Sequence, residues 1–136
     1  MNYNILTIKS QETLQQAFTD AASAGNQAVE NGHLLRSLRE NAGELLSFVL
    51  GKSGVNQNSL WNALDRIIAS YPKVEGGEQY LSNAAAKTFT KAEIAAKSMG
   101  DEFVSVEHIL LGMLAAGDDV AGMLADSGLK IGRAHV

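Results

Sequence analysis

The sequence predicts an all-α protein in which two helical repeats pack around a pseudo-two-fold axis, with about seven helices in total. Its 136 residues are 46% hydrophobic and include a single proline, and much of the apolar content is Ala and Leu, which favour helices. Apolar residues recur three or four positions apart between glycines, a pattern typical of amphipathic helices that end at a glycine. This pattern restarts in the second half of the chain, as it does in a tandem repeat.

Three helices are predicted in the first part of the chain. The first begins at Ser10, whose hydroxyl can accept a backbone hydrogen bond at a helix start, and ends at about Ala24. A short amphipathic helix follows Asn31, and another ends near Gly51 or Gly54. No stretch alternates between apolar and polar residues for long enough to indicate a substantial strand.

A fourth helix and a linker complete the first half. The helix is capped by Asn56 and ends before Pro72, because the residue that precedes a proline avoids the helical conformation. Residues 72–80 contain two adjacent glycines and are therefore predicted to form a linker.

The second half repeats the helical pattern of the first. An Ala-rich helix is predicted from Asn83 to Met99, and Ser105 and Asp118 cap two further helices. The helix that follows Asn56 has no counterpart, since little chain remains after the last predicted helix. The tail, residues 130–136, lacks a helical apolar pattern, and we expect it to be either a truncated end or residues added to the natural chain.

Residue spacing supports a duplication. Gly25 and Gly100 are 75 residues apart, and so are His33 and His108. When a 26-residue window is shifted by 75 positions, eight pairs are identical, whereas about two are expected by chance. The predicted boundaries are 8–71 for the first repeat, 72–80 for the linker, 81–129 for the second repeat and 130–136 for the tail.

Composition excludes several classes of function. The formal net charge is −4 and no cluster of Lys and Arg is present, so we expect no nucleic-acid partner. The absence of Cys excludes disulfides, Cys-based zinc sites and thiol catalysis. The first ten residues lack the basic and apolar regions of a secretory signal, and no apolar run approaches the length of a membrane span. We therefore expect a cytoplasmic protein with no membrane association.

Several segments resemble the Clp amino-terminal domain, a double-repeat domain found at the front of Clp-type AAA+ unfoldases. The likeness is carried by residues 18–38 and, above all, by the segment Gly-Asp-Glu-Phe-Val-Ser-Val-Glu-His-Ile-Leu-Leu at 100–111. Residues 7–11 and the linker segment Tyr-Pro-Lys-Val-Glu-Gly at 71–76 are similar to the version of this domain in ClpB disaggregases. The resemblance covers the chain up to about Leu129.

The resemblance implies recognition of polypeptide rather than catalysis. In the family, the domain sits above a homohexameric ATPase ring, binds unfolded or aggregated polypeptides, and helps to pass them to the pore. The parent protein is expected to be an ATPase that works with an Hsp70-type chaperone system, whereas this domain needs no cofactor and no metal. The alternative is a ClpC-type or free-standing Clp-like domain that docks adaptors for ATP-dependent proteolysis.

Three positions match substrate-contact positions of the family. They are Thr7, Asp101 and Glu107. Each also has a purely structural interpretation, because Thr7 can cap or tether the first helix and Glu107 lies in a first helical turn, where its charge suits the helix dipole. The two interpretations are compatible, since a loop fixed by helix caps is a suitable platform for an extended peptide.

Two other features of the family do not carry over. Some ClpB domains line a groove with leucines, but the matching positions here are Lys91, Ala95 and His108. ClpC-type domains bind phosphorylated arginine at twin Glu-His sites. Glu107 keeps the second of these, but Gly32 replaces the first glutamate. A guanidinium needs a carboxylate for bidentate pairing, so a two-site phosphoarginine receptor is not expected.

Other candidate sites have structural explanations. Gly51, Lys52 and Ser53 resemble part of a phosphate-binding loop, but Leu46 stands where that motif needs glycine, so a helix end is the better interpretation. His33 and His108 lack metal-ligand spacing, and each is expected to hydrogen-bond to a neighbouring turn. A small hydrolase is a further alternative, disfavoured because no G-x-S-x-G motif or metal constellation is present.

Overall fold

The structure is a computed structural model that describes residues 2–131. These residues form seven α-helices, one short 3₁₀ helix and two strands of two residues each, as the all-α prediction requires. Their order is η1 (Tyr3–Ile5), α1 (Ile8–Ser23), β1 (Ala28–Val29), α2 (Asn31–Asn41), α3 (Gly43–Lys52), α4 (Gln57–Ala69), β2 (Tyr80–Leu81), α5 (Asn83–Ser98), α6 (Val106–Leu114) and α7 (Asp119–Asp126). Most of the predicted tail, residues 132–136, lies outside the described residues.

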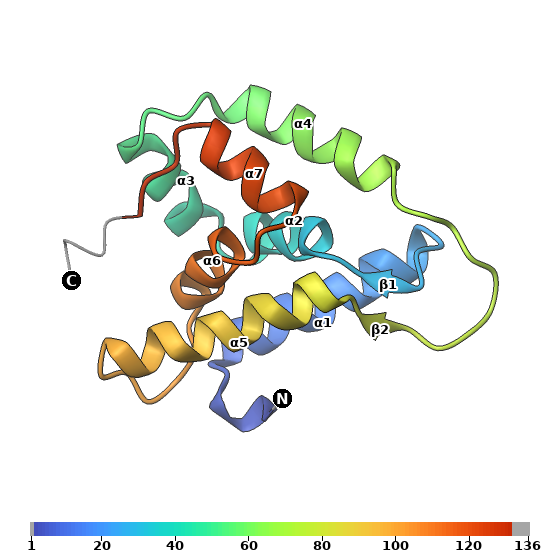
Figure 1. Cartoon of the computed structure of the whole chain (residues 1–136), viewed down its shortest axis with the longest axis horizontal. Helices are drawn as coiled ribbons and strands as arrows, with labels where there is room; N and C mark the ends of the chain where they lie inside the picture. The colour runs from blue at the N-terminus through green and yellow to red at the C-terminus, as the bar shows by residue number, and fades with distance from the viewer. Residues whose placement is uncertain (1, 132–136) are drawn as a thin grey trace.

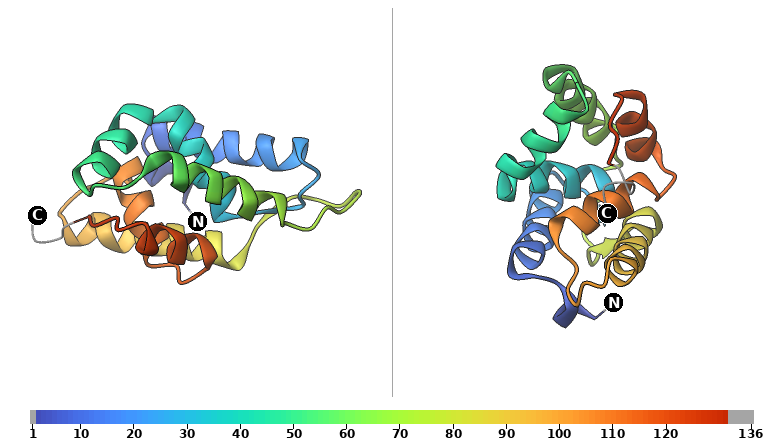
Figure 2. Two further views of the ribbon diagram at one scale, coloured as in Figure 1. Left: turned by 90° about the horizontal axis from the view of Figure 1, so that it is seen from above. Right: turned by 90° about the vertical axis from the view of Figure 1, so that its left-hand side faces the viewer.

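The helices are arranged with pseudo-two-fold symmetry. Helices α2 and α6 lie at the centre, each packed against the long helix of its own repeat, α1 or α5. Each of the two also contacts the long helix of the other repeat, so the repeats share one core. Helix α4 lies along one side, over α7 and α2 (Figure 1), and the further views in Figure 2 show the linker projecting from the helical body.

Most of the predicted helix starts are confirmed, but the first is wrong by a few residues. Asn56, Ser105 and Asp118 are the N-caps of α4, α6 and α7. Helix α1 is capped by Thr7, not by Ser10, because the Thr7 hydroxyl accepts the Ser10 N–H at 3.1 Å. Ser10 is buried in the first turn of α1, where its hydroxyl donates to a carbonyl of the second repeat at 2.9 Å.

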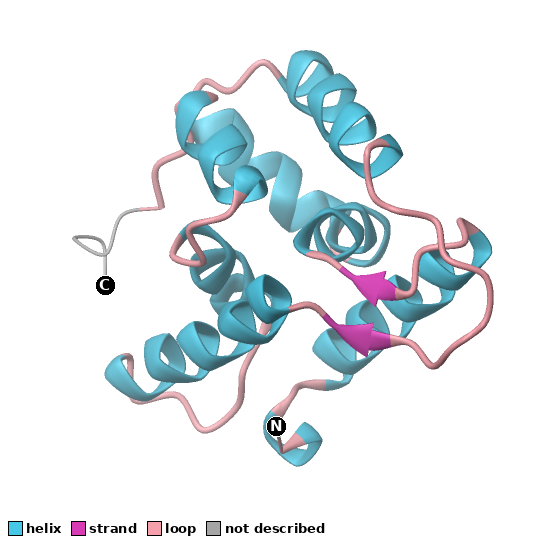
Figure 3. Ribbon diagram, turned by 45° about the vertical axis from the view of Figure 1, so that its right-hand side comes forward, coloured by secondary structure: helices cyan, strands magenta, loops and turns pink. Residues whose placement is uncertain are grey.

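The two strands belong to a pair of symmetric contacts between the repeats. Strands β1 and β2 are parallel and lie side by side in Figure 3, with Val29 opposite Leu81. The equivalent contact is a parallel bridge between Leu6 and Val104. Each residue of one contact is 75 positions from its counterpart in the other. The strands are too short to produce an alternating pattern in the sequence, so only the three-dimensional arrangement reveals them.

Buried polar side chains also join the repeats. The Thr88 hydroxyl of α5 donates to the Asn31 side-chain oxygen of α2 at 2.7 Å. The Asn31 amide in turn donates to the Asp118 carboxylate at the start of α7, at 2.9 Å. Such a chain is stabilising only when each buried group is satisfied. It fixes α2 relative to the second repeat.

Among residues 2–131, no single helix combines the length and hydrophobicity that crossing a membrane requires. Helices α6 and α7 meet that test only when taken together, and they are bent by 96° at the break between them.

Candidate functional site

The three predicted site residues surround the loop that joins α5 to α6. Thr7 lies where α1 starts and is tied to this loop, because its backbone N–H donates to the Val104 carbonyl at 3.1 Å. Its hydroxyl is engaged within α1, accepting the Ser10 N–H and donating to the Ser10 hydroxyl at 2.9 Å. Thr7 therefore holds the loop in place and caps α1 at the same time.

Asp101 lies at the start of the same loop and is held by His108. One oxygen of the carboxylate lies 2.9 Å from His108 Nε2, and the aspartate side chain is 51% exposed. His108 is buried, and its Nδ1 accepts the Ser105 N–H at 2.9 Å. Since Nδ1 is an acceptor, the ring hydrogen is on Nε2 and is donated to Asp101. The second carboxylate oxygen remains available to a ligand.

Glu107 is exposed in the first turn of α6, where its negative charge suits the positive end of the helix dipole. It also lines a groove between α3 and α6, whereas neither Thr7 nor Asp101 does. The structure therefore connects Thr7 and Asp101 through the α5–α6 loop, and it places Glu107 just beyond that loop, at the edge of a separate groove.

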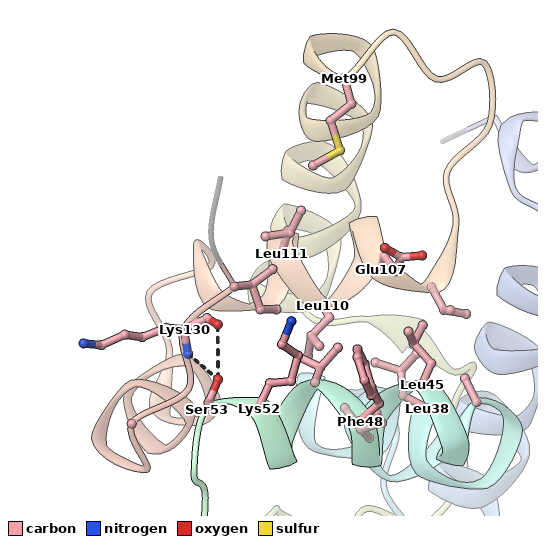
Figure 4. Close-up of a pocket in the computed structure, with 16 residues that line it drawn as sticks. Leu38, Leu45, Phe48, Lys52, Ser53, Met99, Glu107, Leu110, Leu111 and Lys130 are labelled. Carbon is pink, nitrogen blue, oxygen red and sulfur yellow. Dashed lines mark hydrogen bonds between the residues drawn. The ribbon is translucent and has the colours of Figure 1, made fainter. Parts of the chain in front are cut away.

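The groove was not predicted from the sequence. It has a volume of about 770 Å³. Figure 4 shows Lys52 and Lys130 on one side of it and Glu107 on the other, with the exposed Phe48 ring on α3 between them. The remaining side chains that shape it are mainly apolar, and they include Leu38, Leu45, Val49, Met99, Leu110 and Leu111. The available signal was the apolar stripe on α3, which includes residues in addition to those buried in the core.

The pseudo-symmetry relates this groove to a second one. Five residues of α3 line it, and four of them, Leu45, Phe48, Val49 and Lys52, correspond 74 positions later to Asp119, Gly122, Met123 and Asp126 of α7. Those residues of α7 line a second groove, between α7 and α4, in which Asp119, Gly122 and Asp126 remain exposed. The two grooves are thus counterparts, and within the described residues no second copy of α4 flanks the one on α3.

The first repeat contains the counterparts of Asp101 and His108. His33 is buried, its Nε2 lies 3.0 Å from the Asn26 side-chain oxygen, and its Nδ1 accepts the Glu30 N–H at 2.9 Å. Burial, assisted by the Arg36 guanidinium, lowers the pKa of His33 from 6.5 to about 4. The predicted structural role of both histidines is confirmed, because each ring accepts a hydrogen bond from the residue that precedes its helix.

Gly32, the counterpart of Glu107, is covered rather than exposed. Its N–H donates to the Tyr71 hydroxyl at 3.2 Å, and a Cβ at this position would lie 2.5 Å from that oxygen. Burial, followed by the charge of Asp119, raises the pKa of Tyr71 above its usual range, so the phenol stays protonated. The glutamate missing from the first repeat is therefore replaced by a residue that lets Tyr71 approach the backbone.

The arrangement around Asp101 and Glu107 is suited to binding. Residues 2–131 contain no group of three or more His, Cys, Asp or Glu side chains placed to hold a metal ion. The Thr7 hydroxyl is used in a helix cap, and the His108 ring is held on both nitrogens. What the site presents to solvent is carboxylate oxygen, which accepts hydrogen bonds and pairs with cations.

Comparison with known proteins places this site in a known domain. The chain matches the model of the Clp repeat (R) N-terminal domain over residues 5–127. The chain belongs to this family. It is 42% identical over 129 residues to the chaperone protein ClpB of Bacteroides thetaiotaomicron, covering 95% of this chain and 15% of that protein. It is 41% identical to ClpB of Porphyromonas gingivalis, with coverage of 94% and 15%. The chain thus spans about 15% of the length of these relatives.

Solved structures of Clp N-terminal domains have the same fold. The N-terminal domain of Hsp104 from Candida albicans superposes with a TM-score of 0.81 at 18% identity, covering 92% of this chain and 83% of that one. The N-terminal domain of the ClpV1 ATPase from E. coli gives a TM-score of 0.81 at 16% identity, with coverage of 96% and 80%. The chain is a Clp N-terminal domain, similar in sequence to that of ClpB chaperones and in fold to that of Hsp104.

Proposed function

We propose that this Clp N-terminal domain is the substrate-recognition domain of a ClpB-like AAA+ protein disaggregase. It binds unfolded or aggregated polypeptides in the cytoplasm and transfers them to a homohexameric ATPase ring, in cooperation with an Hsp70-type chaperone system. The domain itself carries out no chemistry. Family membership and the likeness to bacterial ClpB chaperones support this proposal.

The observation that carries the proposal is the exposure of carboxylates on a rigid loop. Val104 is paired with Leu6 and accepts the Thr7 N–H, so the loop is fixed to α1. Asp101 and Glu107 lie at the two ends of that fixed segment with their side chains open to solvent. A site that is fixed beforehand loses little conformational entropy on binding, whereas an unfolded ligand must be ordered. Binding at a single domain is therefore expected to be weak and reversible.

Weak binding at one domain is compatible with effective capture by an assembly. Six copies above a ring bind one long polypeptide at several points, and the second binding event is then intramolecular. Weak contacts at each domain also allow the polypeptide to be released to the ring.

The test is titration of an unfolded protein into the 136-residue chain. We suggest reduced, carbamidomethylated lysozyme, followed by fluorescence anisotropy, with Asp101→Ala, Glu107→Ala and a control variant, Glu44→Ala. Glu44 is an exposed acidic residue in the first turn of α3. We expect the two site variants to bind more weakly than the parent and Glu44→Ala to bind as the parent does. Parent-like binding by both site variants refutes the assignment of the site.

A further inference from the structure

Residues 71–78 leave the end of α4, lie against the first repeat and bend over residues 75–77, where Gly76 and Gly77 have positive φ angles. Four hydrogen bonds join them to Gly25, Asn26, Gln27 and Gly32. Gly32 N–H donates to the Tyr71 hydroxyl at 3.2 Å, and the Asn26 amide donates to the Pro72 carbonyl at 3.0 Å. Further along, Val74 N–H donates to the Gly25 carbonyl at 3.0 Å, and the Gln27 amide donates to the Glu78 carbonyl at 3.1 Å. The first repeat therefore binds eight residues of its own chain, 71–78, at a surface formed by the end of α1, the loop after it and the start of α2.

The same surface exists in the second repeat. The counterparts of Gly25, Asn26, Gln27 and Gly32, each 75 positions later, are Gly100, Asp101, Glu102 and Glu107. The side chains of the last three are exposed, and within residues 2–131 no donor reaches the Gly100 carbonyl. Two of the four positions, Asp101 and Glu107, are residues that the proposed function already assigns to substrate binding.

We propose that Gly100, Asp101, Glu102 and Glu107 bind a cationic polypeptide segment in the direction and register in which residues 71–78 lie against the first repeat. This inference rests on the proposed function and specifies the class of substrate that the same site takes. The linker supplies the register. A backbone N–H near the middle of the ligand donates to the Gly100 carbonyl, as Val74 N–H does to Gly25.

The preference for a cationic ligand follows from how the polar groups differ. Asn26 uses its oxygen for His33 and its NH₂ for the Pro72 carbonyl. Asp101 uses one oxygen for His108, so its second oxygen stands where the first repeat has an NH₂ donor. A carbonyl is repelled there, whereas an N–H or ammonium donor is attracted.

At the other two positions, Glu102 and Glu107, the second repeat also has a carboxylate where the first repeat has none. Gln27 donates to the linker through its amide, whereas its counterpart Glu102 can only accept. Gly32 leaves room for the Tyr71 hydroxyl, whereas its counterpart Glu107 carries an exposed carboxylate. Within residues 2–131, the one ion pair or histidine contact made by these three carboxylates is that of Asp101 with His108. Lysine or arginine side chains of the ligand therefore supply the missing donors and positive charge.

The experiment uses three eight-residue peptides based on the linker and labelled for anisotropy. The cationic peptide is Lys-Pro-Lys-Val-Lys-Gly-Gly-Lys, and the neutral and acidic peptides carry Gln or Glu in place of each Lys. Each is titrated into the 136-residue chain, alongside the unfolded lysozyme described above. We expect the cationic peptide to bind at least tenfold more tightly than the other two, with an affinity that falls as salt is raised.

One variant converts the surface of the second repeat into that of the first: Asp101→Asn, Glu102→Gln and Glu107→Gly in combination. We expect it to lose at least tenfold in affinity for the cationic peptide. The control is Glu40→Gln, Glu44→Gln and Asp126→Asn in combination, which removes the same charge from exposed positions elsewhere. The control should bind as the parent does. The register is tested with Gln at the first position of the cationic peptide, which should weaken binding to the parent but not to Glu107→Gln.

The outcomes separate the two proposals. Equal binding of the three peptides, or full binding by the converted variant, overturns this inference while binding of unfolded lysozyme leaves the proposed function intact. If neither the peptides nor the unfolded lysozyme bind, both proposals are wrong. If the control variant loses as much affinity as the converted one, binding reflects net charge alone and the assigned surface is refuted.

Discussion

The two repeats join their central helix to their long helix in different ways. In the first repeat, the Ser37 hydroxyl of α2 donates to the Thr13 carbonyl of α1 at 2.7 Å. The counterpart of Ser37 is Gly112 in α6, which lies so close to α5 that a Cβ there would overlap the carbonyl oxygen of Thr88. One repeat therefore uses a buried side-chain hydrogen bond where the other uses direct backbone contact. Both kinds of contact are compatible with the same pairing of central and long helix, but direct backbone contact brings the two helices closer together than the serine hydrogen bond does.

Gly112→Ala should produce the largest loss of stability. A Cβ at this position would also lie 2.8 Å from the Ala92 backbone nitrogen, and backbone atoms of a packed helix cannot move aside as a flexible side chain can. We expect the free energy of unfolding to fall by about 3 kcal/mol or more, despite the better helix propensity of alanine. Urea unfolding followed by circular dichroism measures the loss.

The matched control is Gly122→Ala in α7. Gly122 is exposed, and a Cβ there would have no atom within 4 Å, so alanine should be neutral or stabilise by up to about 1 kcal/mol. In the first repeat, Ser37→Gly removes two hydrogen bonds without a clash, one donated to the Thr13 carbonyl and one accepted from the Asn41 amide, and should cost about 1–2 kcal/mol. If Gly112→Ala is no worse than Ser37→Gly, the two helix pairs do not differ as described.

The second prediction concerns pH and the histidine of the first repeat. The pKa of His33 is about 4 in the folded protein against 6.5 in the unfolded chain. Between these values the unfolded chain binds a proton that the folded protein does not, so stability falls as pH decreases from 6.5 to 4. At neutral pH the ring is uncharged in both states, so the group does not oppose folding there. We expect a loss of about 2–3 kcal/mol by pH 4.

The measurement is urea unfolding of the parent and His33→Gln at several pH values between 7 and 4. The variant lacks the titrating ring, so its stability should decline less over this range, while the carboxylates contribute equally to both proteins. Parallel pH profiles for the two proteins contradict the prediction.

The third prediction tests whether Asn26 holds the linker. Asn26→Asp keeps an acceptor for His33 but replaces the donor to the Pro72 carbonyl with a second carboxylate oxygen. The cost should be about 1–2 kcal/mol, and the linker should detach locally. Trypsin cleavage after Lys73, an exposed residue of the linker, should then accelerate several-fold. Asn62→Asp, an exposed change within α4, should leave the cleavage rate unchanged.

Most of the helical architecture could be predicted from the sequence because its signals are local. Caps such as Asn56 and Asp118, and the helix-ending Gly25 and Gly100, act within a few residues of themselves. The duplication could also be predicted, since identical residues recur 75 positions apart in the two halves of the sequence. The misplaced start of α1 arose because Thr7 and Ser10 are both good capping residues. What decides between them is that Ser10 is buried against the second repeat.

The candidate site was only partly predictable because its distinguishing features are contacts between distant segments. The family resemblance suggested Asp101 and Glu107 as site residues, but the sequence did not show that Asp101 is bound to His108 or that Tyr71 covers the counterpart of Glu107. Pairs separated by seven residues, or by 39 in the case of Gly32 and Tyr71, leave no periodic signal. Only the three-dimensional structure shows these contacts, and they are needed to infer how a ligand binds the second repeat from how residues 71–78 bind the first.

The smallest predicted effect concerns the two equivalent helix caps. Thr7 caps α1 by accepting the Ser10 N–H at 3.1 Å, and Ser82, 75 positions later, caps α5 by accepting the Ala85 N–H at 3.0 Å. Thr7→Ala and Ser82→Ala should each cost about 1 kcal/mol. Thr90→Ala, in the exposed interior of α5, should be neutral because alanine is the better helix former.

Thr7, unlike Ser82, lies beside the candidate site, and this allows its two roles to be separated. Thr7→Ser keeps the capping hydroxyl, so its stability should match the parent, and Thr7→Ala should lose the cap. If binding of the unfolded lysozyme follows stability in these two variants, Thr7 acts by positioning the α5–α6 loop. A loss of binding in Thr7→Ser, whose cap is intact, would instead require direct contact between the threonine methyl group and the polypeptide.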